Sequence, residues 1–477
     1  MSVSAPQPAA LHPSLLKSGA PLWAATVIGC LCSTMVVMDG AIVNVALPAM
    51  AADLGLSVVG QQWVVDAYLI ALGGFMLLSA RLGDLYGRRR VLQLGLALFT
   101  AASLIGGLAG DGASLLAARA VQGLGASVLA TSTLAVIASA YPKGKARDRA
   151  IGYWTASGSM AAAFGVLLGG VLTAYAGWRW VMFVNVPVGL VLLAMTAATL
   201  SAPERGGERP VLDIAGAVTV TGASACLVYA LAESVTLGWE AREVLGSLVA
   251  ALVLALLFVA IEIGAKQPLV RLGIFRLRNV AVGNLMLMGL GATLTSSLFF
   301  LSIALHQISG YGARDTGLAM LPMCLAIAAT ALGARALRER NVPHLPLLGG
   351  LIAAAGLAWL GVLPAQADYL NDVLGPTLLV GCGAGLLIAS AVHAAIAGIP
   401  PADTGLASGL LNTSRQLGGA LGIAGFVALA HLVAAGQGGS AAAEAAVLAG
   451  HHAAFFATSL VSALTGLLSL ILRHEQA

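Results

Sequence analysis

Long apolar runs dominate the chain, and short polar or charged segments separate them. A helix that crosses a membrane needs about 20 consecutive apolar residues. The pattern therefore predicts an all-α polytopic membrane protein with about 14 transmembrane helices. The run near 404–434 is long enough to include an interfacial turn. The runs lie near residues 22–50, 60–80, 91–110, 114–140, 151–174, 179–200, 212–235, 244–264, 279–304, 314–336, 345–364, 373–398, 404–434 and 452–472.

Composition supports a protein that is largely solvated by lipid. Hydrophobic residues make up 59% of the chain and charged residues 9%, whereas soluble domains carry about 25% charge. The longest polar connections, near 201–211 and 265–278, are too short for a soluble catalytic domain, so we do not expect an enzyme. The five cysteines lie in apolar runs without metal-ligand spacing, and we expect them to be reduced, with no metal site and no cofactor.

The distribution of basic residues fixes the expected orientation. With a cytoplasmic N-terminus, 19 lysines and arginines fall in inside segments and 3 in outside segments, namely Arg179, Arg242 and Arg314. Basic residues concentrate in cytoplasmic loops of membrane proteins. The split predicts that both termini are cytoplasmic and that the number of spans is even. It also explains the net charge of +4 without nucleic acid, and residues 1–20 are expected to form a short cytoplasmic tail rather than a cleaved signal peptide.

The most specific motif is RLGDLYGRRR, between the second and third runs on the expected cytoplasmic side. Gly83 and Gly87 permit a tight turn between antiparallel helices. Asp84 can cap a helix N-terminus or pair with a basic residue. The three arginines that start at Arg88 anchor the loop to the inner face. An ordinary positive-inside loop would not need an acid between two glycines.

This stretch resembles the cytoplasmic loop motif of the major facilitator superfamily, which implies that Gly83, Asp84, Gly87 and Arg88 form a conformational-gating loop. Four further stretches resemble motifs of the same superfamily, two of them from its fourteen-helix drug:proton antiporters, and they occur in the expected order. They are DGAIVNVALP (Asp39–Pro48, first helix), RAVQGLGA (Arg119–Ala126, fourth helix), WRWVMFVNVPVG (Trp178–Gly189, start of the sixth helix) and GLASGLLNTSRQLGGALG (Gly405–Gly422, thirteenth helix).

The resemblance covers nearly the whole chain and implies a particular division of it. We expect a six-helix half over 21–210 and another over 266–477. An extra helix pair over 211–265 would lie between them as a structural spacer. One half would rock against the other around a central site, as in transporters built from repeats.

Two departures from the motifs stand out. Ala80 occupies the place where the loop motif usually opens with glycine. On the fifth run, Val166 stands where the antiporter motif usually has proline, while Gly165, Gly169 and Gly170 are retained. The glycines preserve close helix packing, but the kink that proline would introduce is not expected.

Charged residues inside the runs are few, and such residues usually face the protein interior and serve a function. Asp39, Asp66 and Arg119 all lie roughly 10–18 Å from the outer membrane surface, as counted at 1.5 Å per residue. We hypothesise that the three form one cluster that couples protonation to substrate binding. The alternative is a static ion pair that only holds helices together.

The resemblance assigns finer roles to these residues. Asp39 and Arg119 match the family's proton-coupling residues. Asp66, in the WVVDAY context from Trp63 to Tyr68, matches an acid associated with recognition of cationic drugs. Other charges are weaker candidates: we expect Glu262 to pair with the adjacent basic loop. Arg415 lies on a run where some multidrug relatives carry acids and this chain has none, which weighs against doubly charged cations as substrates.

The sequence as a whole predicts proton-coupled export of lipophilic or cationic small molecules across a bacterial inner membrane. The partners would be the substrate, protons and lipid, without nucleic acid, and the protein would act as a monomer driven by the proton gradient. The alternative is a dedicated exporter of a single endogenous metabolite or biosynthetic product. An importer or uniporter stays open, whereas an enzyme or channel would require a catalytic dyad, clustered metal ligands or a filter loop, and the sequence contains none.

Overall fold

A computed structural model of the chain describes most of its length. The described residues are 17, 20–142, 144–201, 212–265, 268–340, 342, 344–396, 404–436 and 443–472. Of the expected cytoplasmic tail over 1–20, the structure describes only residues 17 and 20. Several basic loop residues, such as Arg205, Arg209 and Lys266, lie outside the described residues.

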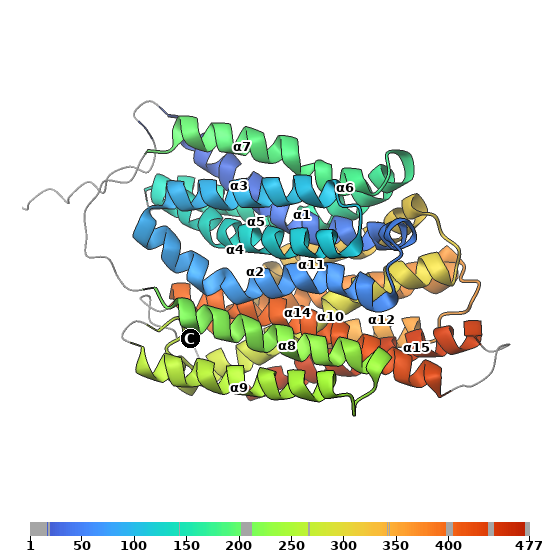
Figure 1. Cartoon of the computed structure of the whole chain (residues 1–477). Coiled ribbons are helices and arrows are strands. Elements are labelled where there is room, and N and C mark those ends of the chain that lie inside the picture. Colours follow the sequence, from blue (N-terminus) through green and yellow to red (C-terminus); the bar gives the residue numbers. More distant parts are fainter. Residues whose placement is uncertain are drawn as a thin grey trace, which may run out of the picture.

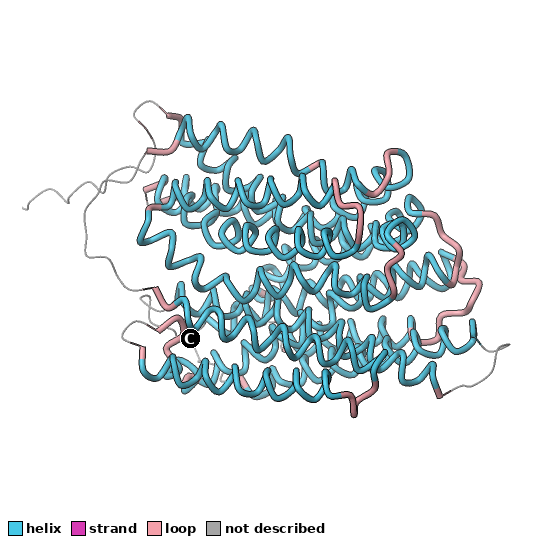
Figure 2. The backbone as a smooth tube through the Cα atoms, in the orientation of Figure 1, coloured by secondary structure: helices cyan, strands magenta, loops and turns pink. Residues whose placement is uncertain are grey.

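The structure is a bundle of α-helices whose axes run in roughly the same direction (Figures 1 and 2). The α-helices are α1 (Leu22–Leu54), α2 (Val58–Tyr86), α3 (Arg88–Gly107), α4 (Gly112–Ala140), α5 (Lys145–Tyr175), α6 (Arg179–Phe183), α7 (Asn185–Thr199), α8 (Ile214–Leu237), α9 (Arg242–Gly264), α10 (Arg278–Gln307), α11 (Ala313–Glu339), α12 (Leu345–Leu360), α13 (Leu374–Ile396), α14 (Thr404–Ala435) and α15 (Ala443–Leu468).

These helices account for the predicted membrane crossings. In the described part of the chain, 13 helical segments are long and apolar enough to span a membrane, and the 16-residue apolar helix α12 occupies the position of the remaining predicted span. The helices α6 and α7 together form one of the 13 segments, Arg179–Thr199. The prediction of an all-α polytopic membrane protein is confirmed. The run near 404–434 is one continuous helix, so the interfacial turn considered for it is absent.

The two ends of the described chain lie at the same end of the bundle. Lys17 donates a hydrogen bond from Nζ to the carbonyl oxygen of Ala197, near the end of α7. The marked C-terminus lies at that end too (Figure 1). An even number of crossings produces this arrangement, as the alternation of basic loops requires.

Glycines allow the closest helix contacts. A Cβ atom added at Gly165 would lie 2.7 Å from the carbonyl oxygen of Met38, and one at Gly169 would lie 2.8 Å from that of Ile42. These positions press α5 against α1. Gly170 makes the same kind of contact with Gly317 of α11, so α5 touches both the N-terminal group of helices (α1–α7) and the C-terminal group (α10–α15). Val166 is fully buried within this unbroken helix.

The extra pair, α8 and α9, lies on one side of the bundle. The helix α8 packs against both α2 and α14, one from each group. Gly74 of α2 makes room for Thr221 of α8, because an added Cβ would clash with its hydroxyl oxygen. The helix α9 packs against α8, and only 11% of the residues in its most apolar 18-residue stretch are buried. Most of α9 is therefore available to lipid.

Candidate functional site

An ion pair lies in the middle of the N-terminal group. Nη1 of Arg119, on α4, lies 2.6 Å from Oδ2 of Asp39, on α1, and both side chains are at most 1% exposed. A charge in the interior of a membrane protein is costly unless it is paired and hydrogen-bonded. The direct contact meets that requirement and confirms that the two residues share a layer, as counting residues predicted.

Neutral polar side chains complete the surroundings of the pair. The Asp39 carboxylate accepts hydrogen bonds from the side-chain amides of Gln122 at 2.7 Å and Asn185 at 3.0 Å. Arg119 donates from Nε to the carbonyl oxygen of Val64 at 3.0 Å. Asp39 thus joins α1 to α4 and α7, and Arg119 joins α4 to α2. Any change in the charge of Asp39 acts on four helices at once.

Tyr68 packs against the arginine of this ion pair. The guanidinium of Arg119 lies over its ring, 4.3 Å from the centroid, and its hydroxyl donates to the carbonyl oxygen of Val36 at 3.1 Å. Tyr68 is 1% exposed, so its ring contacts Arg119 rather than open space. Trp63, five residues earlier on α2, faces Tyr229 of α8 with ring centroids 6.4 Å apart.

Asp66 lies outside the hydrogen-bond network of Asp39 and Arg119. It is fully buried on α2, and Gln62, one turn away on the same helix, donates to its Oδ2 at 3.0 Å. Its Oδ1 is buried and accepts no hydrogen bond from the described residues. Such an atom is costly to leave unsatisfied. The structure therefore brings together two of the three predicted cluster residues and leaves the third with spare acceptor capacity.

One face of α1 shows where the two groups of helices meet and where they separate. Asn44 contacts the C-terminal group, because its carbonyl oxygen accepts a hydrogen bond from Ser302 of α10 at 2.6 Å. On the same face, nearer the start of α1, a Cβ added at Gly40 would meet nothing within 4 Å, and Val37 is 37% exposed. Along this face of α1, the two groups are in contact at Asn44 and there is open space beside Gly40. The helices α2 and α14 stay in contact on the predicted cytoplasmic side, where a Cβ added at Gly409 would lie 2.9 Å from the side chain of Leu77.

The loop between α2 and α3 turns at a single glycine. Gly87 has φ 88° and ψ 132°, a conformation open mainly to glycine. Gly83 stays within α2, so the prediction that both glycines form the turn is corrected: α2 continues to Tyr86 because nothing interrupts its hydrogen bonds. Arg88 donates to the carbonyl oxygen of Ala135 on α4 at 3.0 Å, and Arg89 to that of Ala197 on α7 at 3.3 Å. The side chain of Asp84 lies outside the described part of the structure.

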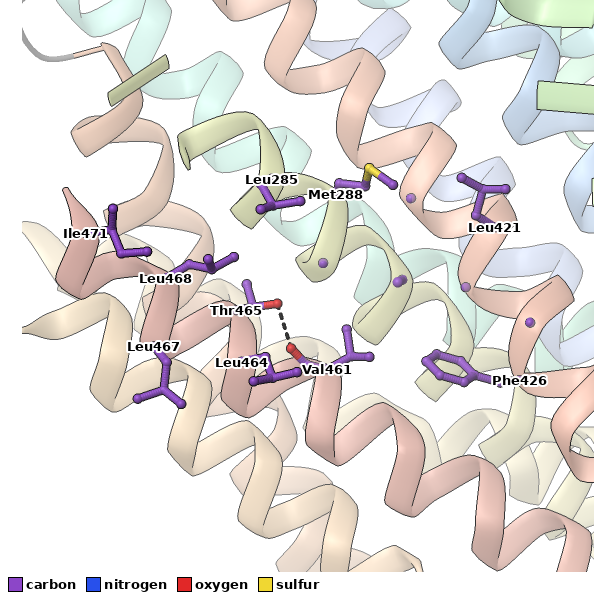
Figure 3. A pocket seen from close by; sticks show the side chains of 15 residues that line it. Leu285, Met288, Leu421, Phe426, Val461, Leu464, Thr465, Leu467, Leu468 and Ile471 are labelled. Atoms are coloured by element: carbon purple, nitrogen blue, oxygen red, sulfur yellow. Dashed lines mark hydrogen bonds between the residues drawn. The ribbon is translucent and has the colours of Figure 1, made fainter. Parts of the chain in front are cut away.

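A surface groove lies within the C-terminal group, away from the charged site. It is an open groove of about 620 Å³ between α10, α14 and α15, and Figure 3 shows its apolar lining. Its one labelled hydroxyl, that of Thr465, donates to the carbonyl oxygen of Val461 at 2.7 Å. The groove therefore offers only an apolar surface. Among the described residues, no group of three or more His, Cys, Asp or Glu side chains could hold a metal ion.

Comparison with known protein families decides the class of this site. The family model described as Major Facilitator Superfamily matches residues 29–423. The chain belongs to the major facilitator superfamily. The match agrees with the motif resemblances found in the sequence.

Within the superfamily, this chain is similar to proteins named for antibiotic export or resistance. It is 39% identical to the cephamycin export protein of Amycolatopsis lactamdurans, over 84% of this chain and 83% of that protein. It is 37% identical to the puromycin resistance protein of Streptomyces alboniger, over 84% of this chain and 80% of that protein. The crystal structure of a D-xylose-proton symporter, at 13% identity, has a TM-score of 0.66 and covers 95% of this chain and 99% of its own. That likeness shows the shared superfamily fold.

Sequence reasoning missed the neutral residues that hold the ion pair. Gln122 and Asn185 lie inside the quoted motifs, but neither stood out because an amide in an apolar run carries no charge. Gln122 also donates to Ser103 of α3 at 2.9 Å. The spacing within the motif could have identified Gln122, because it follows Arg119 by three residues and therefore lies on the same face of the helix.

The two glycines of the loop motif should respond differently to the same substitution. We expect Gly87→Ala to lower stability by about 1–3 kcal/mol, because alanine is strained at its positive φ. Gly83→Ala is the matched control: this position is helical and has space for a Cβ, so we expect a gain of about 0.5–1 kcal/mol. Thermal unfolding of the two purified variants measures the difference. Equal apparent Tm values would contradict the assignment of the turn to Gly87 alone.

Proposed function

We propose that the protein is a proton-coupled exporter of lipophilic or cationic small molecules in a bacterial inner membrane, with both termini in the cytoplasm. The observation that carries the proposal is the buried Asp39 carboxylate, held by donors from α4 and α7 beside the place where the two groups of helices separate. The similarity to exporters and resistance proteins supports the direction of transport.

The mechanism follows from what a proton does at Asp39. A proton on the carboxylate removes the charge that pairs with Arg119 and takes one oxygen away from its amide donors. The contacts that tie α1 to α4 and α7 weaken together. The N-terminal group can then reorient relative to the C-terminal group, and loss of the proton to the other side restores the pair. The proton gradient supplies the free energy, no cofactor takes part, and one chain suffices.

Asp66 is the proposed contact for a cationic group of the substrate. Its Oδ1 has no hydrogen-bond partner in the described part of the chain, so a cation would supply the missing interaction. Trp63, three residues earlier on the same helix, would provide aromatic surface beside it. Tyr68 is buried against Arg119 in this structure and would do so only after the helices move. The junction of α2 and α3, with Gly83 and Asp84 in the last turn of α2, Gly87 at the turn and Arg88 at the start of α3, would act as the gate, because Arg88 and Arg89 tie it to α4 and α7.

A dedicated exporter of one biosynthetic product is the second candidate. Several similar proteins are named for a single antibiotic, including the cephamycin export protein and a tetracenomycin C resistance and export protein of Streptomyces glaucescens. A narrow exporter would protect cells against one compound in a broad resistance panel. A multidrug exporter would protect against several unrelated compounds.

The proposal is tested with the purified protein in liposomes. We expect a pH gradient, acidic inside, to drive uptake of a permanently charged fluorescent cation such as ethidium. A protonophore should abolish this uptake, since it dissipates the gradient that drives it. Protein-free liposomes are the control for passive entry. Uptake that never exceeds this control for any of several cations would contradict proton-coupled export of cations.

A further inference from the structure

Arg415 is a second arginine in the interior of the bundle, and the mechanism above does not use it. It lies on α14, about 16 Å from the first residue of that helix at 1.5 Å per residue. Its carbonyl oxygen packs against Gly291 of α10, and the next residue, Gln416, packs against Gly73 of α2. Arg415 therefore lies where the C-terminal group faces α2.

The charge of Arg415 has no counter-charge among the described residues. Arg119 is paired with Asp39, and Arg179 with Asp53. For Arg415, by contrast, no ion pair or hydrogen bond to a described residue is found; its electrostatic neighbour is the Tyr68 hydroxyl. A guanidinium in a membrane interior that no carboxylate neutralises is costly, so a group from outside the chain would stabilise it.

The buried acids of α1 and α2 do not pair with Arg415 in this structure. The carboxylate of Asp39 already accepts from Arg119, Gln122 and Asn185. Asp66 has spare acceptor capacity, but its side-chain partner among the described residues is Gln62, on its own helix, and not Arg415. Tyr68, whose ring lies against the guanidinium of Arg119, uses its hydroxyl proton for Val36. The positive charge of Arg415 thus remains unmatched at the edge of the proton-coupling site.

A ligand can reach this position. Arg415 is partly exposed, and Asn412, one turn nearer the start of α14, is exposed. On α1, Val37 is 37% exposed and a Cβ added at Gly40 would meet nothing within 4 Å; the carbonyl oxygen of the neighbouring Val36 accepts from the Tyr68 hydroxyl. Tyr68, which is also the electrostatic neighbour of Arg415, therefore links Arg415 to this open stretch of α1.

We propose that Arg415 binds an anionic group, a carboxylate, of the exported molecule. A guanidinium matches a carboxylate with two parallel hydrogen bonds. The inference rests on the proposed export function and narrows its substrate class: lipophilic molecules that carry a carboxylate, alone or with a cationic group, should bind better than the same molecules without it. The same contact would place the anion next to Tyr68, and through it next to the Asp39–Arg119 pair.

A matched pair of dyes tests the inference by binding alone. The full-length protein in detergent is titrated with a rhodamine that has a free carboxyl group and with its methyl ester, and fluorescence polarisation gives both Kd values. We expect Arg415→Gln to weaken binding of the free carboxylate at least about tenfold and to change binding of the ester by less than about twofold. Arg314→Gln, which removes an exposed arginine at the start of α11, is the control and should change neither.

Two results would overturn the inference: an equal loss of affinity for both dyes in Arg415→Gln, or no loss for the carboxylate. If Arg415→Gln does not fold, Arg415→Lys keeps the charge but not the paired hydrogen bonds. It should retain part of the preference for the carboxylate, and an equal change for both dyes would again refute the proposal. Because binding needs no gradient, failure of gradient-driven uptake would refute the export function and leave this test unaffected.

Discussion

Replacing Asp39 with asparagine is expected to abolish gradient-driven uptake, so that transport with a pH gradient equals transport without one. Asparagine keeps the shape of the side chain and an oxygen that can accept from Gln122 or Asn185, but it cannot carry a proton on and off. It also leaves Arg119 buried without its counter-charge, which typically costs about 3–5 kcal/mol. The measurement is ethidium uptake in liposomes, with the apparent Tm of the variant recorded to show that it folds.

Asp53→Asn is the matched control for this substitution. Asp53 lies on the same helix and is also ion-paired, to Arg179 at 2.6 Å, but both side chains are well exposed. Exposed pairs contribute only about 0–1 kcal/mol, so uptake should remain gradient-driven and the Tm nearly unchanged. Gradient-dependent uptake in folded Asp39→Asn would remove Asp39 from the proton-coupling step and favour a static ion pair.

Introducing valine at Gly165 is expected to prevent assembly of the bundle or to lower its stability severely. The added carbon would lie 2.7 Å from the carbonyl oxygen of Met38 and 2.9 Å from Cβ of Ala41. Overpacking in a core costs about 1–3 kcal/mol, and here the obstacle is backbone that cannot rotate aside. The yield of folded protein after purification, and its apparent Tm, measure the effect.

Gly152, near the start of the same helix, provides the comparison. An added Cβ there meets nothing within 4 Å, so Gly152→Val should be tolerated with a change of no more than about 0.5 kcal/mol. If Gly152→Val and Gly165→Val are equally damaging, the effect comes from valine in the helix and not from the contact between α5 and α1.

Much of the fold follows from hydropathy because each crossing must satisfy its backbone hydrogen bonds internally, which only a helix can do along a single apolar run. The exact ends and breaks of individual helices were not predicted from hydropathy. The break between α6 and α7 was not predicted, although Pro187 lies four residues after Phe183, the last residue of α6, and cannot donate a hydrogen bond to its carbonyl oxygen. The run near 345–364 yields a helix of 16 residues, shorter than the thickness of the membrane alone would predict.

The same distinction explains the outcome for the site. Counting residues gives the depth of a side chain, so Asp39 and Arg119 could be placed in one layer. Depth does not give the direction in which a side chain points, and Asp66 at a similar depth turned out to lie apart from the pair. The amides of Gln122 and Asn185 could not be singled out, since their importance arises only when helices distant in sequence pack around one carboxylate.

The position of α8 restricts the kind of movement that export would require. This helix contacts α2 and α14, which belong to different groups, and α9 packs mainly against α8. If the groups rock against each other, α8 cannot follow both, and it must slide along at least one of them during every cycle. The small residues at its contact with α2, such as Gly74, are suited to a sliding surface. The extra pair would then slide along the interface between the two groups in every cycle. How tightly α8 packs against α2 and α14 would help to set the turnover rate.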